Sequence, residues 1–390
     1  MTVREGGDGD AVGGVLPRWV ALPESVEEIA AVLRACAARD LAVVPAGGGT
    51  KLHWGPPPER CDVLLDLCCL NEVLEHAAGD LVVRAQAGVT TDALAAVLAA
   101  EGQELALDVP FSEGATVGGT LATATAGPRA FRYGTARDLL IGITVVLADG
   151  TVARSGGKVV KNVAGYDLGK LFTGSYGTLG VIAEATFRLH PLPAERRWVR
   201  APIAAADLPR IAAALAASQA EPSAAEVDRP APGGPLDLAV LVEGTAAESR
   251  AGALRRLVGG GEVTGTAPPW WGLAPEAEVL AEARFPATGL AAVLDAAAGA
   301  GLAVRGSVLA GRMWLRPVEE PWGGTEPAGA VDGLRRRVED AGGRVVVLAA
   351  PPSARLDRWG RVGALPLMRR VKERFDPGRR MSPGRFVGGI

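Results

Sequence analysis

The stretch SGGKVVKNVAGYDLGKLFTGSYGTLGVIAEATFRLHPLP, residues 155–193, is the most informative part of this chain. It combines dense glycine and several lysines with a hydrophobic run, an arrangement that side-chain packing alone rarely demands. Two further glycine-rich loops lie upstream, PAGGGTKLHWG at 45–55 and PFSEGATVGGTLATATAGPRAFRYGTARDLLIGITVVLADG at 110–150. Glycine has no Cβ and tolerates positive φ, so such loops let backbone N–H groups approach a phosphate-bearing ligand closely.

The common nucleotide-binding motifs do not fit these loops. The segment GGGTK at 47–51 has the wrong order for a P-loop, which needs GxxxxGK[ST] at the start of a helix. The segment GSYGTLG at 174–180 lacks the strand, GxGxxG and helix context of a Rossmann fingerprint. A nucleotide triphosphatase and an NAD enzyme are therefore disfavoured. Taken alone, GGG at 47–49 is also consistent with a plain tight turn, and ATVGGTLATATAG at 115–127 with a tightly packed helix start.

All three glycine-rich segments resemble the FAD-binding domain of the vanillyl-alcohol oxidase (PCMH-type) flavoprotein family. The run KNVAGYDL at 161–168 is similar to one subgroup, the FAD-binding subunits of glycolate dehydrogenase complexes. The resemblance implies an α+β fold. We expect a PCMH-type two-subdomain FAD-binding domain at 15–193, a small α+β cap domain of antiparallel sheet plus helices at 194–350, and a C-terminal segment at 351–390 that packs back on the FAD domain.

The resemblance also implies which residues contact the FAD, with the first loop as the pyrophosphate cradle. Thr50 stands where part of the family carries a histidine that attaches the flavin covalently, and His53 lies three residues on. We therefore expect noncovalent FAD. The expected FAD-contacting residues are Pro45, Gly47, Gly48, Gly49, Thr50, Lys51, Pro110, Thr116, Gly118, Gly119, Thr123, Gly127, Asp138, Gly177, Gly180 and Ile182.

The roles of several charged residues in these segments have two interpretations, one functional and one structural. Arg137 and Asp138 match a YGxxRD element, where they either contact the flavin or form an ion pair that supports the loop. Lys158 and Lys161 either offset pyrophosphate charge or belong to a solvated face. The subgroup markers, whose individual roles stay open, are Lys161, Asn162, Tyr166 and Asp167.

Composition indicates a folded, two-domain protein. The chain has 390 residues, of which 48% are hydrophobic and 22% charged, and a formal net charge of −3, so neither a disordered chain nor a basic nucleic-acid binder is indicated. Its four cysteines form no CxxC pair, which predicts reduced core residues and no metal site. No apolar run approaches the ~18 residues of a membrane span. We therefore expect a cytoplasmic protein that would reach the inner face of a membrane only through its partners.

Hydrophobic periodicity predicts an alternating α/β pattern up to about residue 100. SVEEIAAVLRACAARD (25–40) has helical spacing, and TDALAAVLAAEG (91–102) predicts a helix with Thr91 or Asp92 as its N-cap. Asp149-Gly150 predicts a hairpin turn between two strands. After about residues 191–196 the texture changes, and helices alternate with strands in a pattern that suggests an antiparallel sheet backed by helices.

The residues that would oxidise a 2-hydroxy acid are hard to find. That chemistry needs a hydride acceptor, a base for the hydroxyl proton and a cation for the carboxylate. The chain has only His53, His76 and His190, so no histidine follows residue 190. The catalytic residues therefore stay unknown. Arginines that could hold a carboxylate, although solvated arginines are the simpler interpretation, are Arg284, Arg305, Arg312 and Arg316.

These observations favour an FAD-binding subunit of a glycolate (2-hydroxy acid) dehydrogenase complex, an FAD-dependent oxidoreductase acting on CH–OH groups only as part of that complex. The resemblance implies that its flavin transfers electrons during oxidation of glycolate to glyoxylate. A separate catalytic FAD subunit would remove the hydride and an iron–sulfur subunit would receive the electrons. Two alternatives remain, a self-sufficient FAD-dependent dehydrogenase of hydroxy acids or polyols that uses Tyr166 or a lysine as base, and a structural subunit that has lost its flavin.

Overall fold

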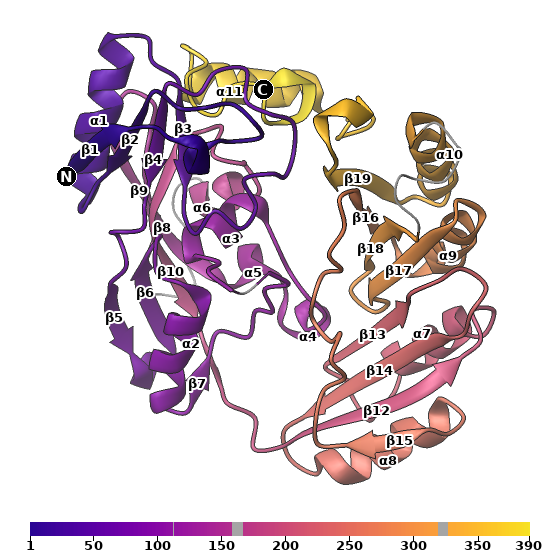
Figure 1. The fold of residues 1–390 in the computed structure, drawn as a ribbon. Coiled ribbons are helices and arrows are strands. Elements are labelled where there is room, and N and C mark those ends of the chain that lie inside the picture. The colour runs from indigo at the N-terminus through magenta and orange to yellow at the C-terminus, as the bar shows by residue number, and fades with distance from the viewer. Residues whose placement is uncertain (112, 158–166, 319–326) are drawn as a thin grey trace. The chain divides into compact units, whose positions relative to one another are not determined.

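The computed structural model describes residues 1–111, 113–157, 167–318 and 327–390. The chain divides into two compact units (Figure 1). Unit 1 comprises residues 1–126, 134–192 and 361–390, and unit 2 comprises residues 127–133 and 193–360. The C-terminal thirty residues therefore belong to the same unit as the N-terminus, although unit 2 separates them in the sequence.

The first sheet of unit 1 has the strand order β1-β2-β4-β3. Strand β4 pairs in parallel with both β2 and β3, whereas β1 is antiparallel to β2. Helix α1 begins after Ser25, whose hydroxyl accepts a hydrogen bond from the Glu28 N–H, and buries Ile29 and Leu33 in the main core of this unit. The elements are β1 (Thr2–Glu5), β2 (Trp19–Leu22), α1 (Val26–Ala38), β3 (Val43–Ala46) and β4 (Val63–Asp66).

The second sheet of unit 1 is antiparallel, with the order β5-β6-β10-β8-β9. The expected hairpin at Asp149-Gly150 is confirmed, since β8 and β9 flank this turn and Gly150 adopts a φ of +82°. The expected N-cap of α2 was wrong by one residue or two, because Thr90 caps the helix by accepting a hydrogen bond from the Ala93 N–H. The elements are β5 (Val73–Ala77), β6 (Val82–Gln86), α2 (Thr91–Ala100), α3 (Val117–Thr123), β8 (Leu140–Val146), β9 (Val152–Gly156) and β10 (Val181–Arg188).

Short elements and one C-terminal helix complete unit 1. After helix α11 the chain returns beside β3, where the Val43 N–H donates to the Arg380 carbonyl and the Ser382 N–H donates to the Val43 carbonyl. This attachment brings the tail to the strand that leads into the first glycine loop. The elements are β7 (Gln103–Glu104), α5 (Ala136–Leu139), α6 (Leu168–Phe172), β11 (His190–Pro191) and α11 (Leu365–Phe375), with 3-10 turns at Asp8–Asp10, Ala78–Asp80 and Val387–Gly389.

Unit 2 is an eight-stranded antiparallel sheet with helices on one face, as expected from the sequence (Figure 1). The strand order is β15-β12-β14-β13-β17-β18-β16-β19. Side chains alternate, so that Val227 packs with the helices while its neighbour Glu226 lies on the opposite face. The strands are β12 (Arg196–Ile203), β13 (Ala224–Arg229), β14 (Leu236–Glu243), β15 (Glu262–Thr264), β16 (Leu280–Arg284), β17 (Leu302–Ser307), β18 (Arg312–Pro317) and β19 (Arg344–Ala349).

The helices of unit 2 are α4 (Ala130–Tyr133), α7 (Leu208–Ala216), α8 (Ala247–Leu257), α9 (Leu290–Gly299) and α10 (Pro327–Asp340), with 3-10 turns at Ala287–Gly289 and Pro352–Ala354. Buried leucines of α7, α8 and α9 face the sheet and form the core of this unit. Across the described ranges of the chain, none of the helices has the length and apolar character needed to cross a bilayer.

Candidate functional site

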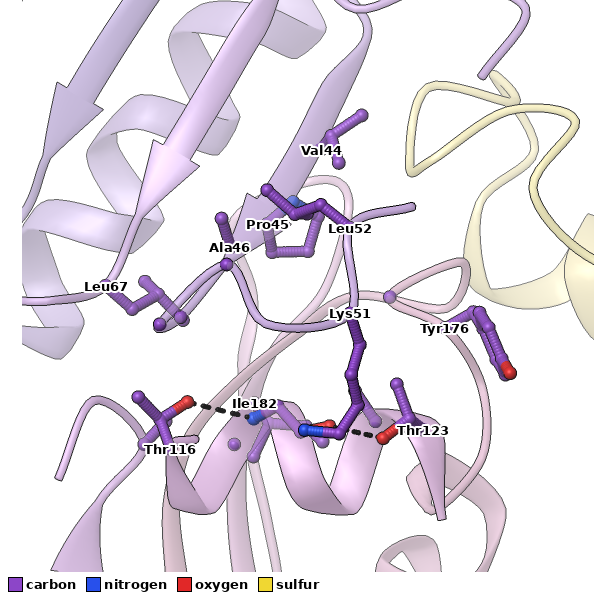
Figure 2. Close-up of a pocket in the computed structure, with 18 of the residues that line it drawn as sticks. Val44, Pro45, Ala46, Lys51, Leu52, Leu67, Thr116, Thr123, Tyr176 and Ile182 are labelled. Carbon is purple, nitrogen blue, oxygen red and sulfur yellow. Dashed lines mark hydrogen bonds between the residues drawn. The ribbon is translucent and has the colours of Figure 1, made fainter. Parts of the chain in front are cut away.

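A pocket in unit 1 lies where the loop after β3 approaches helix α3 (Figure 2). Its floor is formed by small residues of α3 and by Ile182 of β10, and its wall by the first glycine loop. Of the residues expected to contact FAD, the pocket is lined by Pro45, Gly47, Gly48, Gly49, Thr50, Lys51, Thr116, Gly118, Gly119, Thr123, Gly177, Gly180 and Ile182. It is also lined by Val44, Ala46, Leu52, Leu67, Ala87, Ala122, Tyr176 and Arg385.

The first loop presents a run of backbone donors. Within the described part of the chain, the N–H groups from Gly47 to Lys51 donate to no other group, whereas the following Leu52 N–H donates to the Gly49 carbonyl. A Cβ at Gly48 would collide with the Gly114 carbonyl, so only glycine permits this close approach of the two loops. Adjacent, unpartnered N–H groups in a concave loop form a site for an anion such as a pyrophosphate.

Helix α3 is positioned by threonines at both of its ends. Thr116 is the N-cap, and its Oγ1 accepts a hydrogen bond from the Gly119 N–H at 3.2 Å. The Thr123 hydroxyl donates to the Gly119 carbonyl at 2.8 Å (Figure 2). Because Gly118 and Gly119 lack side chains, this first turn leaves backbone at the surface of the pocket, where a flat ring system can lie against it.

Lys51 supplies a positive charge inside the pocket. Only 8% of this residue is exposed, and its Nζ donates to Thr50 Oγ1 at 3.0 Å. Burial lowers the pKa of the Lys51 ammonium to about 8, because charge is less well solvated in the pocket than in water. In Figure 2 the side chain extends from the first loop toward helix α3. Among the described lining residues the cations are Lys51 and Arg385, and none is a carboxylate, so the pocket suits a ligand with negative charge.

Arg385 is a lining residue that sequence reasoning left without a role. Its Nη1 donates to the Leu52 carbonyl at 3.0 Å and its Nη2 to the Trp54 carbonyl at 2.8 Å. Burial lowers its pKa to about 10. Arg385 therefore attaches the tail to the end of the first glycine loop, more than three hundred positions away in sequence.

The third glycine segment enters the pocket through a strained turn. Gly177 has a φ of +71°, and a Cβ there would lie 2.8 Å from Cγ of Pro45. Its neighbour Tyr176 also has a positive φ, of +55°. Positive φ is unfavourable for a residue with a side chain. The turn therefore places Gly177 against Pro45 of β3, the strand that carries the first loop, and both Tyr176 and Gly177 line the pocket.

Three expected residues do not line the pocket. Pro110 is buried elsewhere in unit 1, and Gly127 begins the short segment that belongs to unit 2. Asp138 supports a loop, since its Oδ2 accepts hydrogen bonds from the N–H and the hydroxyl of Thr135, both at 2.8 Å. Arg137 is exposed. For Asp138, this geometry favours the supporting role over direct contact.

The subgroup markers are only partly described. Asp167 is the N-cap of α6, where its carboxylate accepts a hydrogen bond from the Lys170 N–H at 3.1 Å. The other three subgroup markers, and Lys158, lie outside the described residues; the markers are Lys161, Asn162 and Tyr166.

The three histidines lie outside the pocket lining. His53 is exposed, and His190 belongs to the short strand β11. His76 is half-buried in β5, with its Nε2 3.0 Å from Gln103 Oε1. Cys36 and Cys61 are buried, whereas Cys68 and Cys69 are exposed, contrary to the expectation that all four are core residues. The described residues contain no cluster that could hold a metal ion.

The candidate carboxylate-binding arginines of unit 2 are engaged with other groups. Arg284 and Arg312 both pair with the buried carboxylate of Glu282, at 2.7 Å each. Despite burial, which opposes ionisation, these two guanidinium groups lower the pKa of Glu282 to about 2. Arg305 pairs with Asp228 at 2.8 Å, and Arg316 donates to the Pro317 carbonyl at 3.1 Å.

The architecture is that of a PCMH-type FAD-binding fold with an antiparallel cap. It matches the solved structure of an alkyldihydroxyacetonephosphate synthase with a TM-score of 0.69, over 95% of this chain and 77% of that one, at 18% sequence identity. At that identity the likeness concerns the fold alone.

The sequence family agrees with this class. Residues 17–156 match the family model described as the FAD binding domain. The glycines and the two cations that line the pocket fit the negatively charged pyrophosphate of FAD.

Curated relatives each match a little under half of the chain. Glycolate oxidase subunit GlcD of Bacillus subtilis (strain 168) is 36% identical over 48% of this chain and 40% of that protein. D-2-hydroxyglutarate dehydrogenase of Xanthomonas citri pv. viticola is 38% identical over 45% of this chain and 38% of that protein. D-lactate dehydrogenase of Archaeoglobus fulgidus is 40% identical over 44% of this chain and 38% of that protein. The chain thus spans about two-fifths of the length of these relatives.

Proposed function

We propose that this protein is the FAD-binding subunit of a 2-hydroxy acid dehydrogenase complex, with glycolate as the substrate that the complex oxidises. The observation that carries the proposal is the pocket of unit 1, which is lined by α3, by the buried Lys51 and by the amides from Gly47 to Lys51, which have no acceptor among the described residues. The relatives named as a glycolate oxidase subunit, a D-2-hydroxyglutarate dehydrogenase and a D-lactate dehydrogenase support the substrate class.

Different residues of the pocket would bind different parts of the cofactor. The amides of the first loop and Lys51 would hold the pyrophosphate, and the first turn of α3 would lie against the flat flavin ring. When bound, FAD supplies the capacity to accept a pair of electrons and to pass them on. We propose that it binds noncovalently, since Thr50 occupies the position of the attaching histidine and His53 is exposed outside the pocket lining.

Two observations support a relay role over independent oxidation of substrate. Unit 2, residues 127–133 and 193–360, contains no histidine to act as base. The arginines there that were candidates for a substrate carboxylate already have partners, as Arg312 and Arg305 show. We propose that a catalytic FAD subunit removes the hydride and that an iron–sulfur subunit receives the electrons.

An anaerobic absorbance titration tests this function. The purified full-length chain with bound FAD is mixed with glycolate or D-lactate, first alone and then with its catalytic and iron–sulfur partners. We expect the flavin band near ~450 nm to persist with substrate alone and to bleach once the partners are present. Bleaching by the isolated chain would instead establish the second candidate, a self-sufficient dehydrogenase, which the names D-2-hydroxyglutarate dehydrogenase and D-lactate dehydrogenase of two relatives favour.

A further inference from the structure

Unit 2 contains a second pocket, of about 350 Å³, that shares no residue with the pocket of unit 1. It lies between the connection from β12 to α7 and the turn from β13 to β14, elements that Figure 1 labels. Arg229, the last residue of β13, lines it. The other lining residues are apolar or small, namely Pro202, Ile203, Ala204, Ala205, Gly233, Gly234 and Pro235.

The guanidinium of Arg229 is buried without a matching acceptor. Only 2% of this residue is exposed, and its Nε and Nη2 have no hydrogen-bond partner among the residues that the structure describes. Burial lowers its pKa, and the nearby carboxylate of Asp295, an exposed residue of α9, opposes that shift. Arginine keeps its charge in proteins, so it cannot relieve the cost of burial by losing a proton.

Two other largely buried arginines of this chain have acceptors, whereas a third, Arg358, has an unpartnered Nη1 but donates from Nη2 to the Ala350 carbonyl. Arg385 donates to two backbone carbonyls, and Arg312 binds the buried Glu282. In Arg229 the two unpartnered nitrogens form one edge of the planar guanidinium. This edge carries two parallel N–H groups, the geometry that binds a carboxylate or a phosphate through two oxygens.

We propose that this pocket is a binding site for a small oxyanion, held by the Nε and Nη2 edge of Arg229. A carboxylate or phosphate oxygen pair would supply the two missing acceptors and neutralise the buried charge. The walls formed by Ile203, Pro202 and Pro235 suit a short hydrocarbon part, and the glycines of the β13–β14 turn leave room for it. The site is independent of the flavin function, because it uses none of the residues of the unit 1 pocket.

The test is binding of acetate, glycolate and inorganic phosphate to the full-length protein kept saturated with FAD, so that the pocket of unit 1 is occupied. Calorimetry and thermal unfolding report the affinity and the stabilisation. We expect saturable binding of at least one of these anions, and at least a tenfold loss of affinity in Arg229→Met. Whichever probe saturates at the lower concentration identifies the kind of anion.

Two further variants keep this test sharp. Arg229→Lys keeps the charge but loses the two-donor edge, so we expect it to bind more weakly than wild type even if Arg229→Met folds poorly. Arg210→Met changes an exposed arginine of α7 that pairs with Asp207, and should bind as wild type does. The proposal is overturned if no probe binds saturably to wild type, or if both Arg229 variants bind as tightly as wild type.

Discussion

At the scale of single residues, burial and neighbouring backbone decide what each side chain of the pocket can do. Lys51 and Thr50 follow three glycines in the sequence and could have been solvated loop residues. Instead Lys51 is buried in the pocket, with a pKa of about 8. An anionic ligand beside the ammonium favours its protonated form and therefore raises this pKa.

The first prediction follows from that coupling. Affinity for FAD should be constant below about pH 7, where Lys51 is protonated with and without the cofactor. As the pH rises above 8 the affinity should fall by at most about tenfold per pH unit, because Lys51 loses its proton in the free protein but keeps it in the complex. The free energy of unfolding of the apoprotein should instead rise with pH between pH 8 and 10.5, because Lys51 binds more protons there in the unfolded chain than in the folded one.

Fluorescence titration of FAD across this pH range measures the effect. Lys51→Met should bind FAD more weakly and without the pH dependence, whereas Lys170→Met, which changes an exposed lysine of α6, should retain the wild-type profile. An unchanged pH profile in Lys51→Met would show that Lys51 does not face the anionic part of the cofactor.

At the scale of elements, the attachment of α11 and the tail depends on one buried ion pair. Lys372 Nζ donates to Asp376 Oδ2 at 2.7 Å and also to the carbonyls of Thr178 and Met381. The same carboxylate accepts the Met381 N–H at 2.7 Å. Both charged residues are almost fully buried, so each needs the other to offset the loss of solvation.

The second prediction is that Lys372→Met lowers the free energy of unfolding by about 3–5 kcal/mol, because it leaves the Asp376 carboxylate buried and unpaired. Denaturant unfolding measures this change. The matched control, Lys170→Met, removes an exposed i,i+3 pair with Asp167 and should cost no more than about 1 kcal/mol. Equal effects of the two substitutions would contradict the structural role of the buried pair.

Element types followed from sequence patterns more readily than their contacts did. Periodicity indicated α1, the β8–β9 hairpin and the antiparallel sheet of unit 2. Strand β5 was missed because its segment, residues 73–77, contains glutamate and histidine and lacks a clear alternation. Hydrogen bonds to β6 hold it in the sheet, and a local pattern cannot report such pairing.

At the scale of the whole molecule, the chain leaves unit 1, forms unit 2 and returns. Residues 361–390 supply Arg385 to the pocket lining and Lys372 to the core of unit 1. The first glycine loop therefore depends on a segment that follows unit 2 in the sequence.

The third prediction is that a chain ending at Gly360 binds no FAD, although it keeps all three glycine-rich segments. Without the tail, the carbonyls of Leu52 and Trp54 lose the donors that Arg385 supplies. Val43 of β3 also loses its two backbone hydrogen bonds, to Arg380 and Ser382. The absorbance ratio of flavin to protein after gel filtration measures the occupancy. The full-length Arg385→Met variant, which removes only the two loop contacts, should show partial loss. Wild-type occupancy in the shortened chain would refute the dependence.

The sequence by itself determined much of the secondary structure, because glycine positions and hydrophobic periodicity are local properties that constrain backbone conformation, and the resemblance of its glycine-rich segments to a known family indicated the fold class. It indicated the first loop, the start of α3 and the turn at Gly177 as parts of one site, and the structure places them around one pocket. Only the tertiary structure decided that Asp138 supports the loop at Thr135 and that Arg385 donates to the first loop. It also decided that Nε and Nη2 of the buried Arg229 have no hydrogen-bond partner among the described residues. These roles depend on burial and on contacts between distant segments, which no local pattern of residues encodes.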